Sequence, residues 1–152
     1  MRNSQFSFLF RQSDGTIAAP LWRLWTVALT GLCLALAALW TFVSPWTERD
    51  LATQDLFDVK AFAAFVYLLV FAAVVLLAQV SQYNLSAKRF RAKNHAPGWA
   101  AVWPLSAFFA GAAFWAQPNF FGLMPSFVPW LFLLAALAAF GAQFFELGLR
   151  ND

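Results

Sequence analysis

Residues 24–43 read LWTVALTGLCLALAALWTFV and contain no charged side chain. A helix needs about 20 predominantly apolar residues to cross the hydrocarbon core of a membrane. Three further stretches of similar length and composition follow, at about residues 61–83, 98–115 and 128–147. The connections between them are too short to hold a second domain. The sequence therefore predicts an all-α polytopic membrane protein, with four transmembrane helices joined by short loops in a single membrane domain over residues 1–152.

The composition agrees with a membrane protein and excludes two other classes. Of the 152 residues, 62% are hydrophobic and 11% are charged, whereas a soluble domain averages about 45–50% and about 25%. A soluble globular enzyme is excluded on that basis. The aromatic content of 19% is the opposite of a disordered chain. The net charge of +3 does not indicate nucleic acid, because the basic residues flank apolar spans.

Basic residues are distributed unevenly between the two sides of the predicted membrane domain. Lys and Arg near the spans mark the cytoplasmic side of a membrane protein. The N-terminal tail, the connection after the second span and the C-terminal tail together carry eight, and the other side carries two. We therefore expect both termini in the cytoplasm. The eight are Arg2, Arg11, Arg23, Lys88, Arg89, Arg91, Lys93 and Arg150, and the two are Arg49 and Lys60.

The connection after the first span, PWTERDLATQDLFDVK at residues 45–60, is predicted to form a short interfacial helix at about residues 47–60. Its carboxylates indicate a solvated helix face, with a cation site as the less favoured alternative. They are Glu48, Asp50, Asp55 and Asp58. Cys33 is the only cysteine, so an intramolecular disulfide is impossible.

The connection after the second span carries polar residues at helical spacing. Five of them follow steps of 3, 4, 3 and 4, at Gln79, Gln82, Ser86, Arg89 and Lys93. This spacing places them on one face of a helix that continues beyond the membrane. Asn94 is expected to end that helix in the left-handed conformation. Gln79 and Gln82 are expected to make polar contacts between helices.

A basic cluster lies in the same connection. Lys88, Arg89, Arg91 and Lys93, with Trp99 at the start of the third span, are the residues predicted to bind anionic lipid headgroups or a partner. Basic side chains next to a span attract anionic headgroups. The alternative is that the cluster only sets the orientation of the chain in the membrane.

This part of the chain resembles the DUF805 family of small bacterial inner-membrane proteins. The resemblance rests on KRFR at residues 88–91, a turn that contains Asn94, PGW at residues 97–99, and an aromatic N-terminal stretch at residues 6–10. Ala92 stands where the family has Asp, and Thr16 stands where it has a first arginine. The resemblance implies a multi-pass protein of the bacterial inner membrane, and it implies no reaction.

The predicted spans carry no Asp, Glu, Lys or His in their cores. Ionisable residues inside the membrane mark proton relays and ion pathways, so a pump, an ion-coupled transporter and a charged pore are disfavoured. We expect a non-catalytic binding or accessory subunit of a larger membrane complex, with membrane lipids as further partners. No catalytic residue, metal, cofactor or nucleic acid is predicted. The alternative is a small transporter or membrane sensor that binds a lipid or apolar ligand within the bundle, for which Pro104, Gln79 and Gln82 are the support.

Two titratable residues and a set of small residues have more than one interpretation. His95 is expected to be a solvated loop residue, and Glu146 is expected to face headgroups or to pair with Arg23 or Arg89. Small residues at four-residue spacing allow helices to approach closely, either within this bundle or against a partner. They are Gly31 with Ala35, Ala107 with Gly111, and Ala135 with Ala139 and Ala142 nearby.

Overall fold

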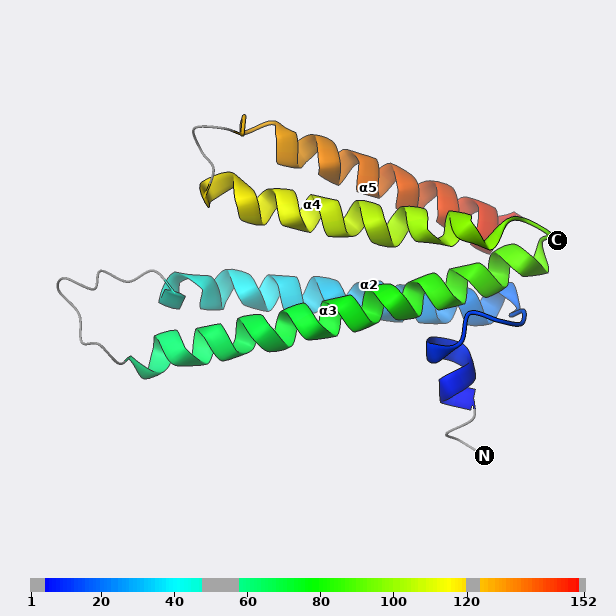
Figure 1. Cartoon of the computed structure of the whole chain (residues 1–152), viewed down its shortest axis with the longest axis horizontal. Helices are drawn as coiled ribbons and strands as arrows, with labels where there is room; N and C mark the ends of the chain where they lie inside the picture. Colours follow the sequence, from blue (N-terminus) through cyan, green and yellow to red (C-terminus); the bar gives the residue numbers. More distant parts are fainter. Residues whose placement is uncertain (1–4, 48–57, 120–123, 151–152) are drawn as a thin grey trace. The chain divides into compact units, whose positions relative to one another are not determined.

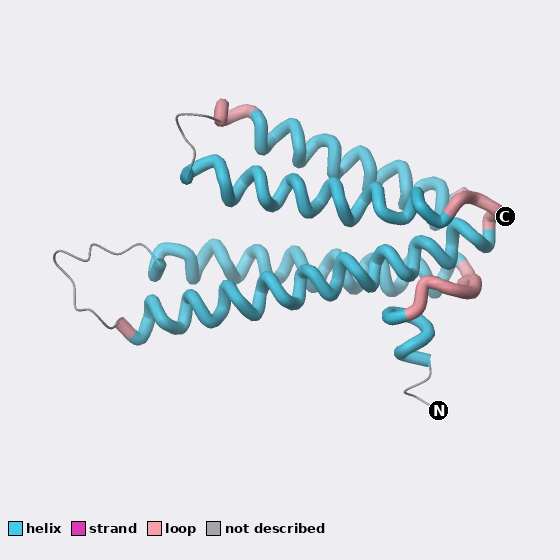
Figure 2. Tube along the Cα trace, in the orientation of Figure 1, coloured by secondary structure: helices cyan, strands magenta, loops and turns pink. Residues whose placement is uncertain are grey.

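The computed structural model describes residues 5–47, 58–119 and 124–150, and it is helical with no strand in these ranges (Figures 1 and 2). The long helices are α2 (Ala19–Val43), α3 (Val59–Ala92), α4 (Val102–Asn119) and α5 (Val128–Phe144). Four helical segments are long and apolar enough to cross a membrane, at Ala19–Thr47, Val59–Ala92, Pro97–Gln117 and Val128–Leu149. Each contains one predicted span, and the predicted all-α fold with four spanning helices is confirmed.

Four short helical turns accompany the long helices in the described residues. They are η1 (Ser7–Arg11), η2 (Ser44–Thr47), η3 (Pro97–Ala101) and η4 (Phe145–Leu149). Proline occupies the first turn of η3 and of α5, where its missing N–H removes no hydrogen bond. The interfacial helix predicted at about residues 47–60 falls mostly on residues 48–57, which lie outside the described residues.

Helix α3 continues well past the apolar part of its sequence, as the polar spacing predicted. It reaches Ala92, and Asn94 follows with φ of 56°. The N–H of Asn94 donates to the carbonyl of Arg91, and the N–H of His95 donates to the carbonyl of Phe90. These bonds satisfy carbonyls that the end of the helix leaves open. The predicted left-handed terminator at Asn94 is confirmed.

The chain forms two compact units, one of residues 27–79 and one of residues 1–26 with 80–152. In the unit of residues 27–79, α2 and α3 contact each other through Tyr67, whose hydroxyl donates to the carbonyl of Leu36 at 2.6 Å. The ring of Tyr67 also stacks with that of Trp40, with 6.2 Å between centroids. These contacts join the apolar halves of the first two spanning helices.

In the other unit, α4 and α5 form a helical hairpin. Ala110 and Ala113 of α4 and Ala136 of α5 are buried, and small side chains allow two helices to approach closely. Trp103 packs on Phe140 with 4.9 Å between ring centroids. Large apolar side chains are exposed along the two helices, among them Leu105, Phe108, Leu134 and Leu137. Such exposure is expected of helices that lie in lipid.

Candidate functional site

The polar residues at the end of α3 form two opposite faces of the helix, and both lie in the unit of residues 1–26 and 80–152. Residues spaced by three or four lie on the same face of a helix. One face carries Asn84, Lys88 and Arg91. The other carries Gln82, Ser86, Arg89 and Lys93. We call the first the N-segment face and the second the C-turn face, after the parts of the chain that they bind.

Lys88, on the N-segment face, is enclosed by main-chain oxygens of the N-terminal segment, residues 5–18. Its ammonium donates to the carbonyls of Phe8, Leu9 and Gln12. The residue is 0% exposed, and its Nζ lies 4.7 Å from the centroid of the Phe8 ring. A lysine ammonium has three N–H donors, so these carbonyls use all of them. The charge is thereby solvated by the protein and not by water.

Two neighbours on the N-segment face bind the same segment. The side-chain amide of Asn84 donates to the carbonyl of Phe10 at 2.7 Å, and the Arg91 guanidinium donates to the carbonyl of Ser13. Arg91 also lies 3.8 Å from the carboxylate of Asp14, which is almost fully exposed. The N-terminal segment is therefore held along its length by side chains of α3.

A glycine turns the N-terminal segment toward α2. Gly15 has φ of +87°, a conformation that favours glycine. A Cβ at this position would lie 2.8 Å from Cε2 of Phe8. Ile17, just beyond the turn, is buried. The turn therefore depends on glycine both for its backbone angle and for the space beside Phe8.

The C-turn face begins with a buried hydrogen-bonded group. The amide of Gln82 donates to the hydroxyls of Thr26 at 3.0 Å and of Ser86 at 3.3 Å. The indole N–H of Trp22, which is 1% exposed, donates to Ser86 at 3.2 Å. The predicted interhelical role of Gln82 is confirmed, since Thr26 belongs to α2. Gln79 is half-buried and makes no side-chain hydrogen bond within the described part of the chain.

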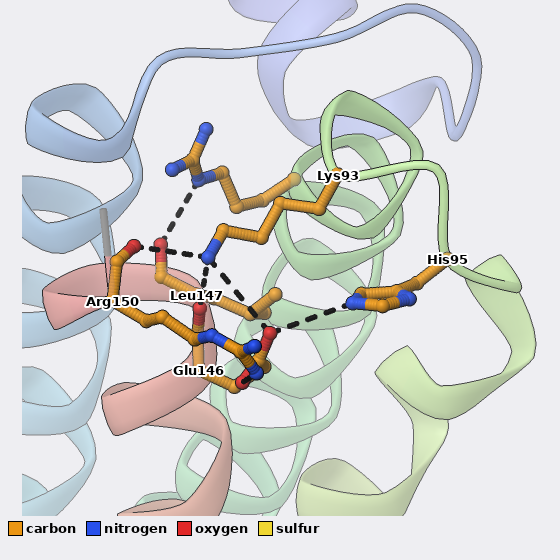
Figure 3. A network of polar contacts seen from close by, with 6 residues as sticks. Lys93, His95, Glu146, Leu147 and Arg150 are labelled. Carbon is orange, nitrogen blue, oxygen red and sulfur yellow. Dashed lines mark hydrogen bonds and ion pairs between the residues drawn. The ribbon is translucent and has the colours of Figure 1, made fainter. Parts of the chain in front are cut away.

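Further along the C-turn face, two cations bind the last turn of the fourth spanning segment (Figure 3). Arg89 donates through Nε to the carbonyl of Leu147 at 2.9 Å. Lys93 donates through Nζ to the carbonyls of Glu146 at 2.7 Å and of Arg150 at 2.9 Å. The last carbonyls of a helix have no partner within it, and a cation there also complements the helix dipole. Arg89 and Lys93 thus hold η4 against the end of α3.

Three basic residues surround the carboxylate of Glu146 (Figure 3). Arg150 lies 2.9 Å away, His95 3.4 Å and Lys93 3.8 Å. These are not the expected partners Arg23 and Arg89. Arg150 reaches this carboxylate because it follows Glu146 by four residues. Lys93 and His95 reach it because the turn after α3 places them beside it. His95 is half-exposed, and it contacts this carboxylate as well as solvent.

The residues at positions 88–93 that were predicted to bind lipid headgroups or a partner are mostly enclosed by the protein. Lys88 and Arg89 are 0% and 2% exposed, because carbonyls left open in η1 and η4 bind them. The Lys93 side chain is 7% exposed and that of Arg91 is 33% exposed. Trp99, 63% exposed, lies at the surface. Of the predicted binding residues, only Arg91 and Trp99 present much of their side chains.

Asn84, Glu146 and Arg150 belong to this site but were not among the predicted binding residues. Asn84 shares helical spacing with Lys88 and Arg91, a second polar stripe that the sequence contains. The spacing of Glu146 and Arg150 by four residues is also a local signal. Within the described residues, no group of three or more His, Cys, Asp or Glu side chains is placed to hold a metal ion.

Comparison with known proteins gives no relative: no family model, curated protein or solved structure matches the chain.

Proposed function

We propose that this chain is a non-catalytic binding or accessory subunit of a membrane complex, inserted as a multi-pass protein in a bacterial inner membrane. The observation that carries the proposal is the engagement of Lys88, Arg89 and Lys93 by main-chain carbonyls. All three N–H groups of the Lys88 ammonium donate to main-chain carbonyls, which leaves none of them for a substrate. The cluster thus holds the N-terminal segment and η4 against the end of α3.

The proposed orientation in the membrane and the proposed location each have their own support. The described N-terminal and C-terminal residues both bind the end of α3, and the basic residues of the chain concentrate there. We propose that this end faces the cytoplasm, as the distribution of Lys and Arg indicates. The resemblance to the DUF805 family, on residues 88–91 and 97–99, supports the bacterial inner membrane as the location.

The outward face of α5 is where we place the protein partner. Ala135, Ala138, Gly141 and Ala142 are exposed on this helix, and a Cβ at Gly141 would meet no atom within 4 Å. The packing of α5 on α4 uses Ala136 instead. Small outward side chains let a helix of another protein come close, and close packing is the main source of helix association in lipid.

A pull-down of the tagged protein from its native membrane in mild detergent, followed by mass spectrometry, tests this proposal. We expect a stoichiometric protein partner that is lost in Gly141→Leu, because a leucine would separate the two helices. The matched control is Ala73→Leu, at an exposed position of α3, which should keep the partner. A chain that purifies alone, or a partner retained equally by both variants, would contradict the proposal.

A ligand binder within the bundle is a second candidate, favoured by two buried amide oxygens. Oε1 of Gln82 and Oε1 of Gln143 have no hydrogen-bond donor within the described residues, although the residues are 3% and 7% exposed. A buried acceptor without a donor is unfavourable by about 1–3 kcal/mol. A small polar ligand that donates to these oxygens would relieve this.

Native mass spectrometry of the purified protein tests the second candidate. A bound small molecule should be released by Gln143→Leu, whereas Gln79→Leu, which removes a half-buried amide from the other unit, should retain it. If the wild-type protein carries no bound small molecule at any detergent concentration, this candidate is removed.

A further inference from the structure

In the unit formed by residues 1–26 and 80–152, the described residues carry more basic than acidic side chains. They include seven basic side chains and two acidic ones. The basic ones are Arg11, Arg23, Lys88, Arg89, Arg91, Lys93 and Arg150, and the acidic ones are Asp14 and Glu146. The carbonyl oxygens around Lys88 solvate its charge and carry no formal negative charge of their own. An anion from outside the chain is therefore attracted to this unit.

Part of the accessible charge lies at Arg150, beside Glu146; Arg11 is also exposed, and the Arg91 side chain is 33% exposed. The side chains of Arg150 and His95 are 65% and 50% exposed, and that of Glu146 is 24% exposed. Arg150 and His95 both contact the same carboxylate, which offsets part of the charge of Arg150 and fixes the position of both side chains. Arg150 presents a guanidinium fork, which matches the oxygens of a phosphate group.

Apolar side chains adjoin this exposed charge. Phe145 and Leu149 of η4 are 61% and 54% exposed, and they are neighbours in sequence of Glu146 and Arg150. Trp99 is 63% exposed and is tied to α5 by the amide of Gln143, which donates to its carbonyl at 2.7 Å. An exposed indole beside the end of a spanning helix is typical of the headgroup level of a membrane.

We infer that the edge formed by His95, Glu146 and Arg150 binds the phosphate of an anionic phospholipid, with acyl chains along Phe145 and Leu149. Charge complementarity selects an anionic headgroup, and the apolar side chains select a lipid over a free phosphate. The sequence predicts lipid or partner binding at Lys88, Arg89, Arg91, Lys93 and Trp99. Lys88 and Arg89 are buried, whereas Arg150 is exposed. The lipid site does not require the proposed protein partner, because it uses η4 and the turn after α3 and not the outward face of α5.

Binding of phosphatidylglycerol and phosphatidylcholine to the detergent-purified full chain, counted by native mass spectrometry, tests the inference. Each basic residue near an anionic surface contributes about a fivefold change in affinity. We therefore expect Arg150→Gln to weaken phosphatidylglycerol binding about fivefold. Glu146→Gln should strengthen it by a similar factor, because it removes the competing carboxylate. The matched control Lys60→Gln removes one exposed positive charge from the other unit and should change nothing.

The opposite signs of the two variants separate lipid binding from a structural role. A variant that only loosened η4 would lower binding, so a decrease in both Arg150→Gln and Glu146→Gln overturns the inference. Equal binding of the two lipids also overturns it. Displacement of phosphatidylglycerol by inorganic phosphate at equal concentration would instead assign the edge to a soluble anion. His95→Gln, in an exposed loop, repeats the test should Arg150→Gln not fold, and it is expected to weaken binding in the same direction.

Discussion

Lys88 shows how main-chain carbonyls can enclose a buried charge. It is held by three carbonyls and one aromatic face from residues 8–12. Burying an ion is costly unless its hydrogen-bonding groups are satisfied, and here each donor has an acceptor. The residue therefore fastens the N-terminal segment instead of presenting a charge to the surroundings.

Lys88→Met is expected to release the N-terminal segment, because it leaves three carbonyls without their donor. Losing hydrogen bonds to a buried charge reduces stability by about 2–3 kcal/mol, which corresponds to roughly 30-fold or more faster amide exchange. Hydrogen exchange of a peptide covering residues 5–18 measures this. Lys60→Met, at an exposed position, should leave the same peptide unchanged. Equal exchange in the two variants would show that Lys88 does not hold the segment.

Gly15 is the second position where one residue controls this segment. Gly15→Ala should destabilise the turn by about 1–2 kcal/mol, since a left-handed backbone is unfavourable for alanine, and the new Cβ meets the Phe8 ring. Gly31→Ala is the matched control, because its Cβ meets no atom within 4 Å and it lies within helix α2. Thermal unfolding in detergent should separate the two substitutions. Equal thermal stability of Gly15→Ala and Gly31→Ala would contradict this expectation.

At the scale of the element, α3 is a spanning helix that also organises both ends of the chain. Its final turns carry two opposite polar faces, one on the N-terminal segment and one on η4. Because the faces are opposite, a substitution on one should leave the other bound. This separation follows from helical geometry alone.

Lys93→Met tests this independence. It removes the donor to the carbonyls of Glu146 and Arg150 and should speed exchange in residues 145–150 about tenfold, as expected for loss of one charge-assisted contact near the surface. Exchange in residues 5–18 should stay at the wild-type rate. Lys88→Met should give the reverse pattern, and a variant that accelerates both peptides equally would show that the two faces are coupled.

At the scale of the whole molecule, the four apolar helices are those of a multi-pass membrane protein. The side of the membrane on which each connection lies is our proposal from the basic residues. Single cysteines introduced in a Cys33→Ser background test it with a membrane-impermeant thiol reagent. Lys60→Cys should react in intact cells, whereas Arg150→Cys should react only after lysis. Reaction of Arg150→Cys in intact cells, with Lys60→Cys reacting only after lysis, would reverse the proposed orientation.

Much of the architecture could be predicted because it depends on local properties. The four spans follow from apolar length, and the continuation of α3 to Ala92 and its end near Asn94 follow from polar spacing and turn chemistry. The connection at residues 48–57 lies outside the described residues, so its predicted helix stays a prediction.

The burial of the basic cluster could not be read from local pattern. A run such as KRFR at residues 88–91 has the same composition whether its charges face water or protein. Lys88 binds a carbonyl 80 residues away, and Arg89 binds one 58 residues away. Main-chain acceptors have no sequence signature, because every residue carries a carbonyl. The chain's composition and periodicity were enough to define the spanning helices, but folding the two ends onto α3 selected which cations are enclosed and which, like Arg150, remain exposed.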